Sequence, residues 1–213
     1  MNLKSHLAAV LVLALGLAVS TAQSGKILYT NDFEKAEDGK VPDAMLVLDG
    51  SFAVRSEGGN KFLELPGAPL DTFGVIFGTT QNSGVAVSAR IFGTAKGRRA
   101  PTFGVGLNGV GGYKLQMSPA KKALEIFKGD EALASVPFEW ASGSWAHLKL
   151  HVIPSGAVWK IEGKAWKEGQ PEPAQWQVTF EEKTKPSDGR ASLWGLPYSG
   201  TPLWFDDLVL AAE

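Results

Sequence analysis

The sequence predicts an all-β protein in which two antiparallel sheets stack face to face. Helical patterns are nearly absent after residue 22, because glycine or proline interrupts every stretch of about a dozen residues that could keep a helical spacing of apolar side chains. Short runs of alternating apolar and polar residues recur instead, separated by Gly, Pro, Asn and Asp. Many short strands at such spacing are typical of a two-layered sandwich.

Taken in order, fifteen strands are expected, and a two-sheet antiparallel β-sandwich of jelly-roll type accommodates them. The expected strands are 26–32, 45–48, 51–55, 61–65, 74–78, 85–92, 102–107, 113–117, 124–128, 132–137, 145–153, 158–166, 176–180, 191–196 and 203–210.

Two of these strands show the clearest alternation. In 85–92 the apolar side chains at odd positions face one way, and Ser88 and Arg90 face the other. In 145–153 the even positions form the core face, and His147, Lys149 and His151 form the opposite face. Two histidines four residues apart on a strand lie about 13 Å apart, too far for one metal ion to bridge. We therefore expect both to be solvent-facing residues of a half-buried strand.

The first 22 residues match a secretory signal peptide. Lys4 supplies the positive charge, an apolar segment follows at 7–19, and small residues precede a cleavage site after Ala22. The apolar segment is shorter than the roughly 20 residues that span a bilayer. We expect an exported protein, periplasmic or secreted, whose mature chain (23–213) is a single sandwich domain without membrane insertion. The chain has no cysteine, so no disulfide stabilises it.

The charge pattern argues against nucleic acid and anionic membranes as partners. The formal net charge is −1, and no basic stripe with interleaved aromatic residues occurs. The one basic cluster, at 96–99, is expected to be a solvated hairpin tip.

Sequence motifs of the common hydrolases are absent. There is no Gly-x-Ser-x-Gly, no His-Glu-x-x-His, no phosphate-binding loop, and no Glu-x-Asp-x-x-Glu strand motif of glucanases. Glu181 and Glu182 are adjacent and therefore point to opposite faces of a strand. The match to Gly-x-Gly-x-x-Gly at 104–109 lacks the following helix that dinucleotide binding needs. We interpret these glycines as a hairpin turn that also permits close sheet packing.

Acidic residues at the two ends of the chain suggest a structural calcium ion. Asp32 and Glu34 end the first strand, and Asp206 lies in the last. Terminal strands of such sandwiches usually pair, so oxygens from both could surround Ca²⁺, which takes 6–8 oxygen ligands. The alternative is a set of carboxylates that accept backbone N–H groups or face solvent.

All seven tryptophans lie in the C-terminal third of the chain or close to it. Flat aromatic rings bind sugars because the apolar face of a pyranose stacks on them. We expect Trp159 and Trp176 in the core, where their strands turn inward. Trp194 and Tyr198 are the candidates for an exposed ligand-binding platform.

The C-terminal half resembles concanavalin A-like lectin/glucanase domains (laminin-G and jelly-roll sandwiches) of exported bacterial proteins. The residues that carry the resemblance are the strand 145–153, Gly163-Lys164-Ala165-Trp166, Glu172-Pro173 followed by Trp176, Gly189, the closing run 205–210, and the opening 31–34 with Gly39 and Pro42. The resemblance implies the fold, export and sugar binding. In several such modules the acids of the two end motifs bind a structural Ca²⁺, and no glucanase catalytic residue has a counterpart here.

The sequence thus favours an exported, non-catalytic binding module for a polysaccharide or envelope glycan. Two alternatives stay open. One is a glycoside hydrolase of the same fold whose carboxylates converge from several loops, and the other is a structural or adaptor protein of the cell envelope.

Overall fold

The computed structural model describes residues 25–68 and 71–213. The signal-peptide prediction (1–22) lies outside these residues. Fifteen strands form in the described chain, and each coincides with a predicted strand to within a few residues. They are β1 (Ile27–Asn31), β2 (Leu46–Asp49), β3 (Ala53–Glu57), β4 (Asn60–Leu65), β5 (Phe73–Gln81), β6 (Val85–Gly93), β7 (Thr102–Leu107), β8 (Tyr113–Ser118), β9 (Ala123–Lys128), β10 (Glu131–Pro137), β11 (Ser144–Ser155), β12 (Val158–Lys167), β13 (Val178–Glu182), β14 (Gly189–Leu196) and β15 (Leu203–Ala212).

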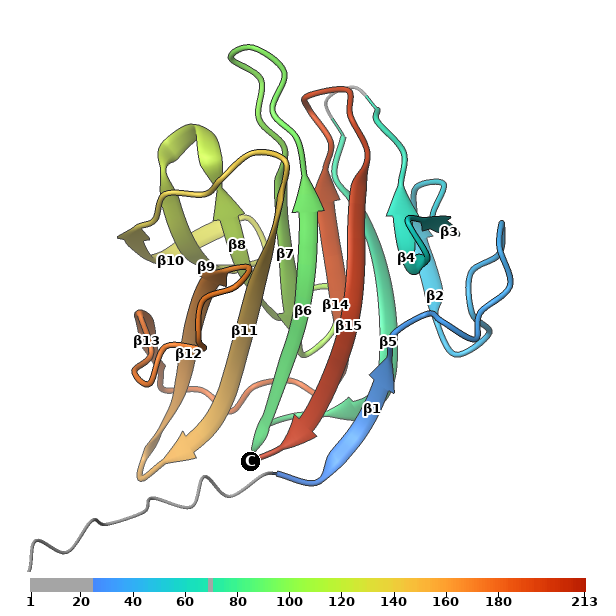
Figure 1. The fold of residues 1–213 in the computed structure, drawn as a ribbon. Helices are drawn as coiled ribbons and strands as arrows, with labels where there is room; N and C mark the ends of the chain where they lie inside the picture. Colours follow the sequence, from blue (N-terminus) through green and yellow to red (C-terminus); the bar gives the residue numbers. More distant parts are fainter. Residues whose placement is uncertain (1–24, 69–70) are drawn as a thin grey trace, which may run out of the picture.

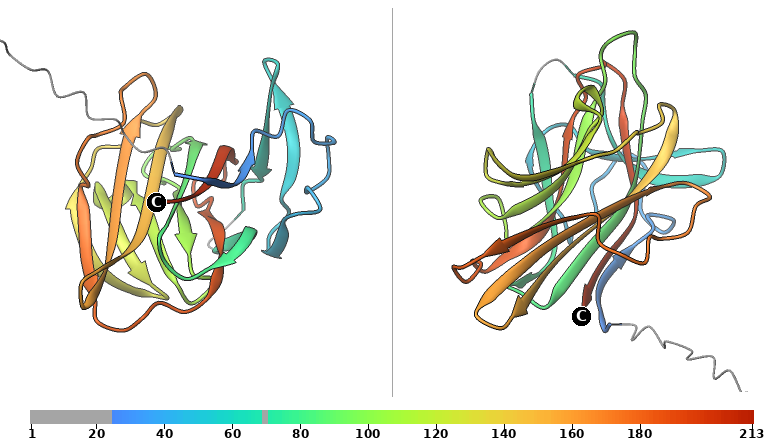
Figure 2. Two further views of the ribbon diagram at one scale, coloured as in Figure 1. Left: turned by 90° about the horizontal axis from the view of Figure 1, so that it is seen from below. Right: turned by 90° about the vertical axis from the view of Figure 1, so that its left-hand side faces the viewer.

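The strands form two antiparallel sheets, as predicted (Figure 1). The larger sheet has the order β13-β12-β11-β6-β15-β4-β3, and β1 also pairs with β15. The smaller sheet has the order β10-β9-β8-β7-β14-β5-β2 and lies behind the larger one in Figure 1. Figure 2 shows the two layers from below, with the start of β1 close to the C-terminus. Strands distant in sequence therefore lie side by side in both sheets.

The core lies between the sheets and follows the predicted alternation. On β6, Val87 and Ile91 are fully buried, and on β11 Leu148 and Leu150 are fully buried. They belong to one contiguous apolar cluster contributed by both sheets. The prediction that His151 faces solvent is wrong, because only 5% of its surface is exposed. The Trp176 ring stacks on its imidazole at 5.0 Å between centroids.

Trp176 also departs from its predicted place. It precedes β13 rather than opening it, and it lies half-buried on the outer face of the larger sheet. Lys164 is 4.6 Å from its ring centroid, and this lysine is itself buried and paired with Glu172 at 2.7 Å. The aliphatic stems of such lysines cover apolar surface, which explains why a polar strand face became partly buried. Trp159 is half-buried and packs against the core, in line with its predicted place.

A β-bulge shapes the last strand. Asp206 pairs with Arg90 and Val209 with Ser88, so β15 holds one extra residue against β6. Asp207 lies within the bulge and has a left-handed φ of 50°. The bulge lets Phe205 and Leu208, three residues apart, both point into the core. Beyond it, the other edge of β15 changes partner from β4 to β1.

Two predicted turns are confirmed. The glycine motif at 104–109 runs along β7 into a turn at Asn108 and Gly109, both with left-handed φ, before β8. The basic cluster closes a hairpin through an isolated bridge between Lys96 and Arg99, which are exposed. Among the residues that the structure describes, no helix has the length and apolar character that a membrane crossing requires.

Candidate functional site

Trp194 lies flat on the outer face of the smaller sheet. It sits on β14, directly opposite Gly74 of β5 and Gly104 of β7. A Cβ atom added to Gly74 would lie 2.7 to 3.2 Å from three carbons of the six-membered ring, so that ring covers Gly74. A Cβ added to Gly106 would lie 3.1 Å from the indole nitrogen. The missing side chains of these glycines therefore provide the floor on which the indole rests.

A hydrogen bond fixes this ring in place. The indole Nε1–H of Trp194 donates to Oγ of Ser192 at 2.8 Å, and Ser192 is fully buried. One ring face is against the sheet, and the ring lines the depression above it. This is the arrangement that aromatic stacking on a ligand requires.

Lys114 and Phe127 stand beside this ring. Lys114 of β8 pairs across the strands with Gly106 on one side and Phe127 of β9 on the other. Its ammonium nitrogen lies 5.8 Å from the Trp194 ring centroid and 5.2 Å from that of Phe127. Burial lowers the pKa of Lys114, and the charges of Asp130 and Glu125 oppose this effect.

Two adjoining depressions form one groove over these residues. They share Thr72, Lys114, Gly129, Asp130 and Trp194, and we refer to them together as the Trp194 groove. One end extends over the hydroxyl of Thr102 and the amide of Gln116. The other end extends over the β7–β8 turn, where Val110 is 60% exposed. The groove thus combines a flat ring with hydroxyl, amide and charged groups around it.

The second predicted platform residue lies elsewhere. Tyr198 is exposed in the loop after β14, and it does not line either depression of the Trp194 groove. Its ring is 5.8 Å from the guanidinium carbon of Arg99 at the basic hairpin. Trp194 and Tyr198 therefore do not form a single platform in this arrangement.

The outer face of the larger sheet is also rich in aromatic side chains, but they cover one another. Trp204 stacks between Phe62 and Phe92 with centroids 4.4 and 4.5 Å apart, so both of its faces are occupied. Arg90 lies over the Trp145 ring at 4.5 Å. Phe62 is buried, and Phe92 and Trp204 are half-buried. Trp204 therefore has no free ring face on which a ligand could stack.

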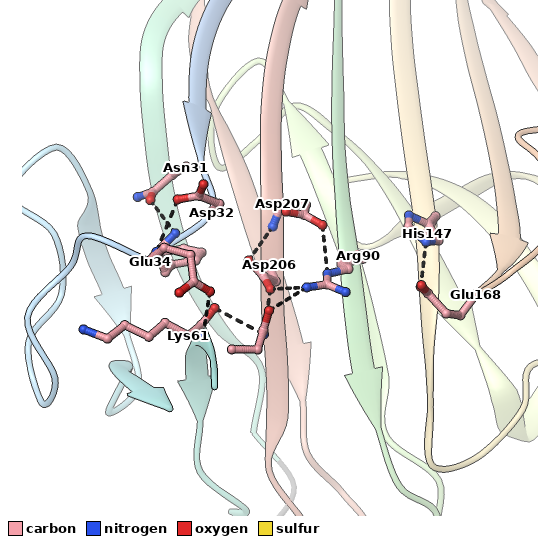
Figure 3. Close-up of polar contacts among 11 residues, drawn as sticks. Asn31, Asp32, Glu34, Lys61, Arg90, His147, Glu168, Asp206 and Asp207 are labelled. Carbon is pink, nitrogen blue, oxygen red and sulfur yellow. Dashed lines mark hydrogen bonds and ion pairs between the residues drawn. The ribbon is translucent and has the colours of Figure 1, made fainter. Parts of the chain in front are cut away.

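The acids predicted to bind calcium are bonded to protein groups (Figure 3). The carboxylate of Asp32 accepts the backbone N–H of Glu34, and the carboxylate of Glu34 accepts that of Lys61. Asp206 is 1% exposed, and Arg90 and Asn60 donate to it at 2.6 and 3.0 Å. Burial raises the pKa of Asp206, although its hydrogen-bond donors and Arg90 lower it.

These residues do not fit a calcium site in this arrangement. The terminal strands pair as expected, since β1 runs beside β15. Yet Arg90 already supplies the positive charge that Asp206 needs, and Nε of the same guanidinium lies 2.9 Å from a carboxylate oxygen of Asp207. Within 25–68 and 71–213 no group of three or more His, Cys, Asp or Glu residues is placed to hold a metal ion. Calcium binding stays a prediction that requires these acids to exchange partners.

Sequence reasoning proposed Trp194 as a candidate ligand-binding residue but did not predict the residues that surround it. Lys114 and Gln116 show only the ordinary alternation of a half-buried strand, which gives no sign of a site. Gly74 and Gly106 come together next to the indole because β14 inserts between β5 and β7. That strand order is not readable from local sequence patterns.

No protein-family model matches the chain, and neither does any curated protein. Solved structures do match. Carbohydrate binding module CBM66 from Bacillus subtilis is 11% identical with a TM-score of 0.56, over 79% of this chain and 95% of that one. A protein of unknown function with a galectin-like fold, also from Bacillus subtilis, is 10% identical with a TM-score of 0.62, over 89% and 97%.

A xylan β-1,4-xylosidase from Bacillus halodurans C-125 also matches, at 16% identity and a TM-score of 0.58. The match covers 85% of this chain but 38% of the xylosidase. The protein therefore has the two-sheet, jelly-roll β-sandwich fold of these structures, as the sequence predicted. At these identities the likeness is one of fold.

Proposed function

We propose that this protein is an exported, non-catalytic module that binds a polysaccharide or envelope glycan in the Trp194 groove. The observation that carries the proposal is the Trp194 ring, which lies flat over Gly74 and lines a groove with polar side chains on its rim. A pyranose stacked on this ring would place its hydroxyls near Thr102, Gln116 and Asp130. The carbohydrate-binding proteins among the structural neighbours and the signal-peptide pattern of residues 1–22 support sugar binding and export.

The acidic residues of the groove favour binding over hydrolysis. Glycosidases of the usual kind hold two carboxyl groups about 5 to 9 Å apart across the scissile bond. Among the described residues that line the Trp194 groove, Asp130 is the single carboxylate. Glu125 is buried nearby on β9 and paired with Lys121 at 3.1 Å. Two free carboxylates facing one sugar are therefore not assembled here.

The distribution of apolar surface gives little support to a protein-binding adaptor. Among residues 25–68 and 71–213, the large apolar side chains that are exposed are Ile27, Leu46, Leu48, Val110 and Tyr198. Of these, Leu46 and Leu48 share a strand, β2 at the edge of the smaller sheet, and the others lie on separate segments. Docking surfaces for proteins usually present a larger contiguous apolar patch.

Affinity electrophoresis in gels cast with soluble polysaccharides tests the proposal. We expect at least one of xylan, mixed-linkage β-glucan, levan, dextran and polygalacturonate to retard the mature protein. Trp194→Ala should abolish the retardation, whereas the matched control Trp176→Ala, which truncates a tryptophan on the opposite sheet, should keep it. Tyr198→Ala tests the second predicted residue in the same gels. Thermal melting confirms that each variant is folded.

Two results would contradict the proposal. If no polysaccharide in the panel retards the wild-type protein, glycan binding is wrong. If the protein releases reducing ends from the retained polysaccharide at a rate that Asp130→Asn abolishes, the module is an enzyme rather than a binding domain.

A further inference from the structure

The ammonium group of Lys114 is the charged centre of the Trp194 groove. It lines both depressions that make up the groove and lies beside two aromatic rings. Within the described chain no carboxylate oxygen lies within 4.0 Å of it, and it makes no side-chain hydrogen bond. The paired lysines of the outer faces behave differently: Lys121, Lys128, Lys149 and Lys164 each have an acidic partner at 2.7 to 3.6 Å.

The surroundings of Lys114 give its ammonium group no bonded acidic partner, although the charges of Asp130 and Glu125 act on it from farther away. Aromatic rings attract a cation weakly compared with a carboxylate, and their attraction grows when the site is desolvated. Asp130, at the β9–β10 turn, is the groove's own acid, and it is not bonded to Lys114. Burying an ammonium without a bonded acidic partner is costly, so an anion supplied by a ligand could pair with Lys114 favourably.

We propose that the glycan bound in this groove carries an acidic sugar whose carboxylate or sulfate pairs with Lys114 while the sugar ring stacks on Trp194. This inference rests on the proposed function. Lysine suits the role because a compact ammonium accepts an anion from several directions, whereas arginine favours planar, two-pronged pairing. Gln116, on the same strand and lining the same groove, supplies amide hydrogens for a hydroxyl or for the second oxygen of the anion.

Other charged groups near the site do not reproduce this arrangement. The ammonium nitrogen of Lys121 lies 5.8 Å from the ring centroid of Phe127, but it is bound to the carboxylate of Glu125. Lys128 is bound to Glu182 at 2.7 Å. Selectivity for an acidic sugar is therefore assigned to Lys114 rather than to a general positive field, which agrees with a net charge near zero.

Matched pairs of polysaccharides test the inference. Polygalacturonate is compared with its methyl ester, which keeps the sugar ring but removes the charge, and dextran sulfate is compared with dextran. Titration calorimetry should show wild-type protein binding at least one acidic member about tenfold more tightly than its neutral partner, the effect expected of one charge-assisted contact. The pair that shows the preference tells whether the anion is a carboxylate or a sulfate.

Two variants distinguish the contribution of Lys114 to the acidic preference from that of the protein's overall charge. Lys114→Met keeps the aliphatic stem and should reduce the preference for the acidic member to less than about threefold. Lys122→Met removes the same charge from an exposed lysine outside the groove, and it should leave the preference unchanged. Thermal melting of both variants confirms that they are folded.

The possible failures are distinct. If neutral and acidic members bind equally and Trp194→Ala abolishes both, the inference is wrong and the proposed function stands. If an acidic preference persists in Lys114→Met or falls equally in Lys122→Met, the assignment to Lys114 is overturned. If no polysaccharide of either kind binds, both the inference and the proposed function are overturned.

Discussion

At the scale of single residues, the flat placement of the Trp194 ring, the proposed ligand platform, depends on glycines beneath it. Trp194 can lie flat because Gly74 and Gly106 have no side chains, and the buried Ser192 hydroxyl holds the indole nitrogen. The sequence predicted Trp194 as a candidate platform, which stays a prediction, whereas Gly74 and Lys114 gave no signal. Their importance arises from contacts across strands that are far apart in the chain, which residue patterns do not reveal.

Replacing Gly74 by alanine should weaken glycan binding without unfolding the protein. The added methyl group would lie 2.7 Å from Cζ3 of Trp194, so the ring must tilt away from the sheet. We expect a loss of about tenfold in affinity, since stacking depends on the ring's orientation. Gly111→Ala is the matched control, because a Cβ there meets open space. Calorimetry that finds Gly74→Ala and Gly111→Ala equally competent would contradict the role of the glycine floor.

Replacing Arg90 by methionine should be strongly destabilising. Asp206 is almost fully buried, and Arg90 supplies its nearest positive charge at 2.6 Å. Removal of one member of a buried ion pair typically costs about 3 to 5 kcal/mol of unfolding free energy. Denaturant unfolding measures the loss, and Lys40→Met, which breaks an exposed pair, should cost less than about 1 kcal/mol. A loss for Arg90→Met as small as that of the control would show that Asp206 does not depend on Arg90.

At the scale of elements, local alternation predicted the strands and their division into two antiparallel sheets, but it did not give the strand order. All fifteen strands were predicted, because the alternation of apolar and polar side chains along a strand can be recognised from neighbouring residues. The bulge in β15 was not predicted, although the three-residue step from Phe205 to Leu208 is incompatible with regular alternation. The burial of His151 was also missed, because the covering ring of Trp176 comes from a loop and not from the sheet.

Glu182 provides a tie between the two sheets that should depend on pH. It lies on β13, and its carboxylate accepts hydrogen bonds from Lys128 and Tyr113 of the opposite sheet and from the N–H of Thr184. The hydrogen bond from Lys128 is the main reason that the pKa of Glu182 is held at about 2, below its ordinary 4.5. A lowered pKa contributes stability that is complete above the unfolded-state value and is lost as the pH falls toward the folded-state value.

We therefore expect wild-type stability to decline between about pH 4.5 and pH 2, and Glu182→Gln to remove part of this decline. Denaturant unfolding across this range measures it. Glu139→Gln, in an exposed pair with Lys122, is the control and should leave the profile almost unchanged. Parallel profiles for wild type and Glu182→Gln would contradict the role of the tie.

At the scale of the whole molecule, the sandwich presents two outer faces with different organisation. The larger sheet carries stacked rings and paired charges, and its acids are bonded to Arg90 and to backbone groups. The smaller sheet carries the Trp194 groove with the unpaired Lys114 at its centre. Fold class could be predicted from sequence, whereas the surroundings of Trp194 in the proposed binding groove depend on the strand order, which local patterns do not reveal.

Calcium binding by acids from both ends of the chain would affect the stability of the whole fold, and thermal melting measures this effect. If Asp32, Glu34 and Asp206 exchanged their present partners for Ca²⁺, binding would stabilise the folded state in proportion to occupancy, and the Tm in millimolar CaCl₂ would exceed that in EDTA. Equal melting temperatures would remove the calcium prediction and agree with neutralisation of Asp206 by Arg90.

The most direct test of glycan binding in the Trp194 groove is a ¹H–¹⁵N spectrum of the seven tryptophan indole groups during titration with oligogalacturonate and with xylo-oligosaccharides. Trp194→Phe assigns the signal of interest. We predict that the Trp194 indole signal shifts in proportion to saturation with at least one of these sugars, while the signal of Trp204, enclosed between Phe62 and Phe92, stays in place. Shifts confined to tryptophans of the larger sheet, or no shift with either sugar, would contradict binding in this groove.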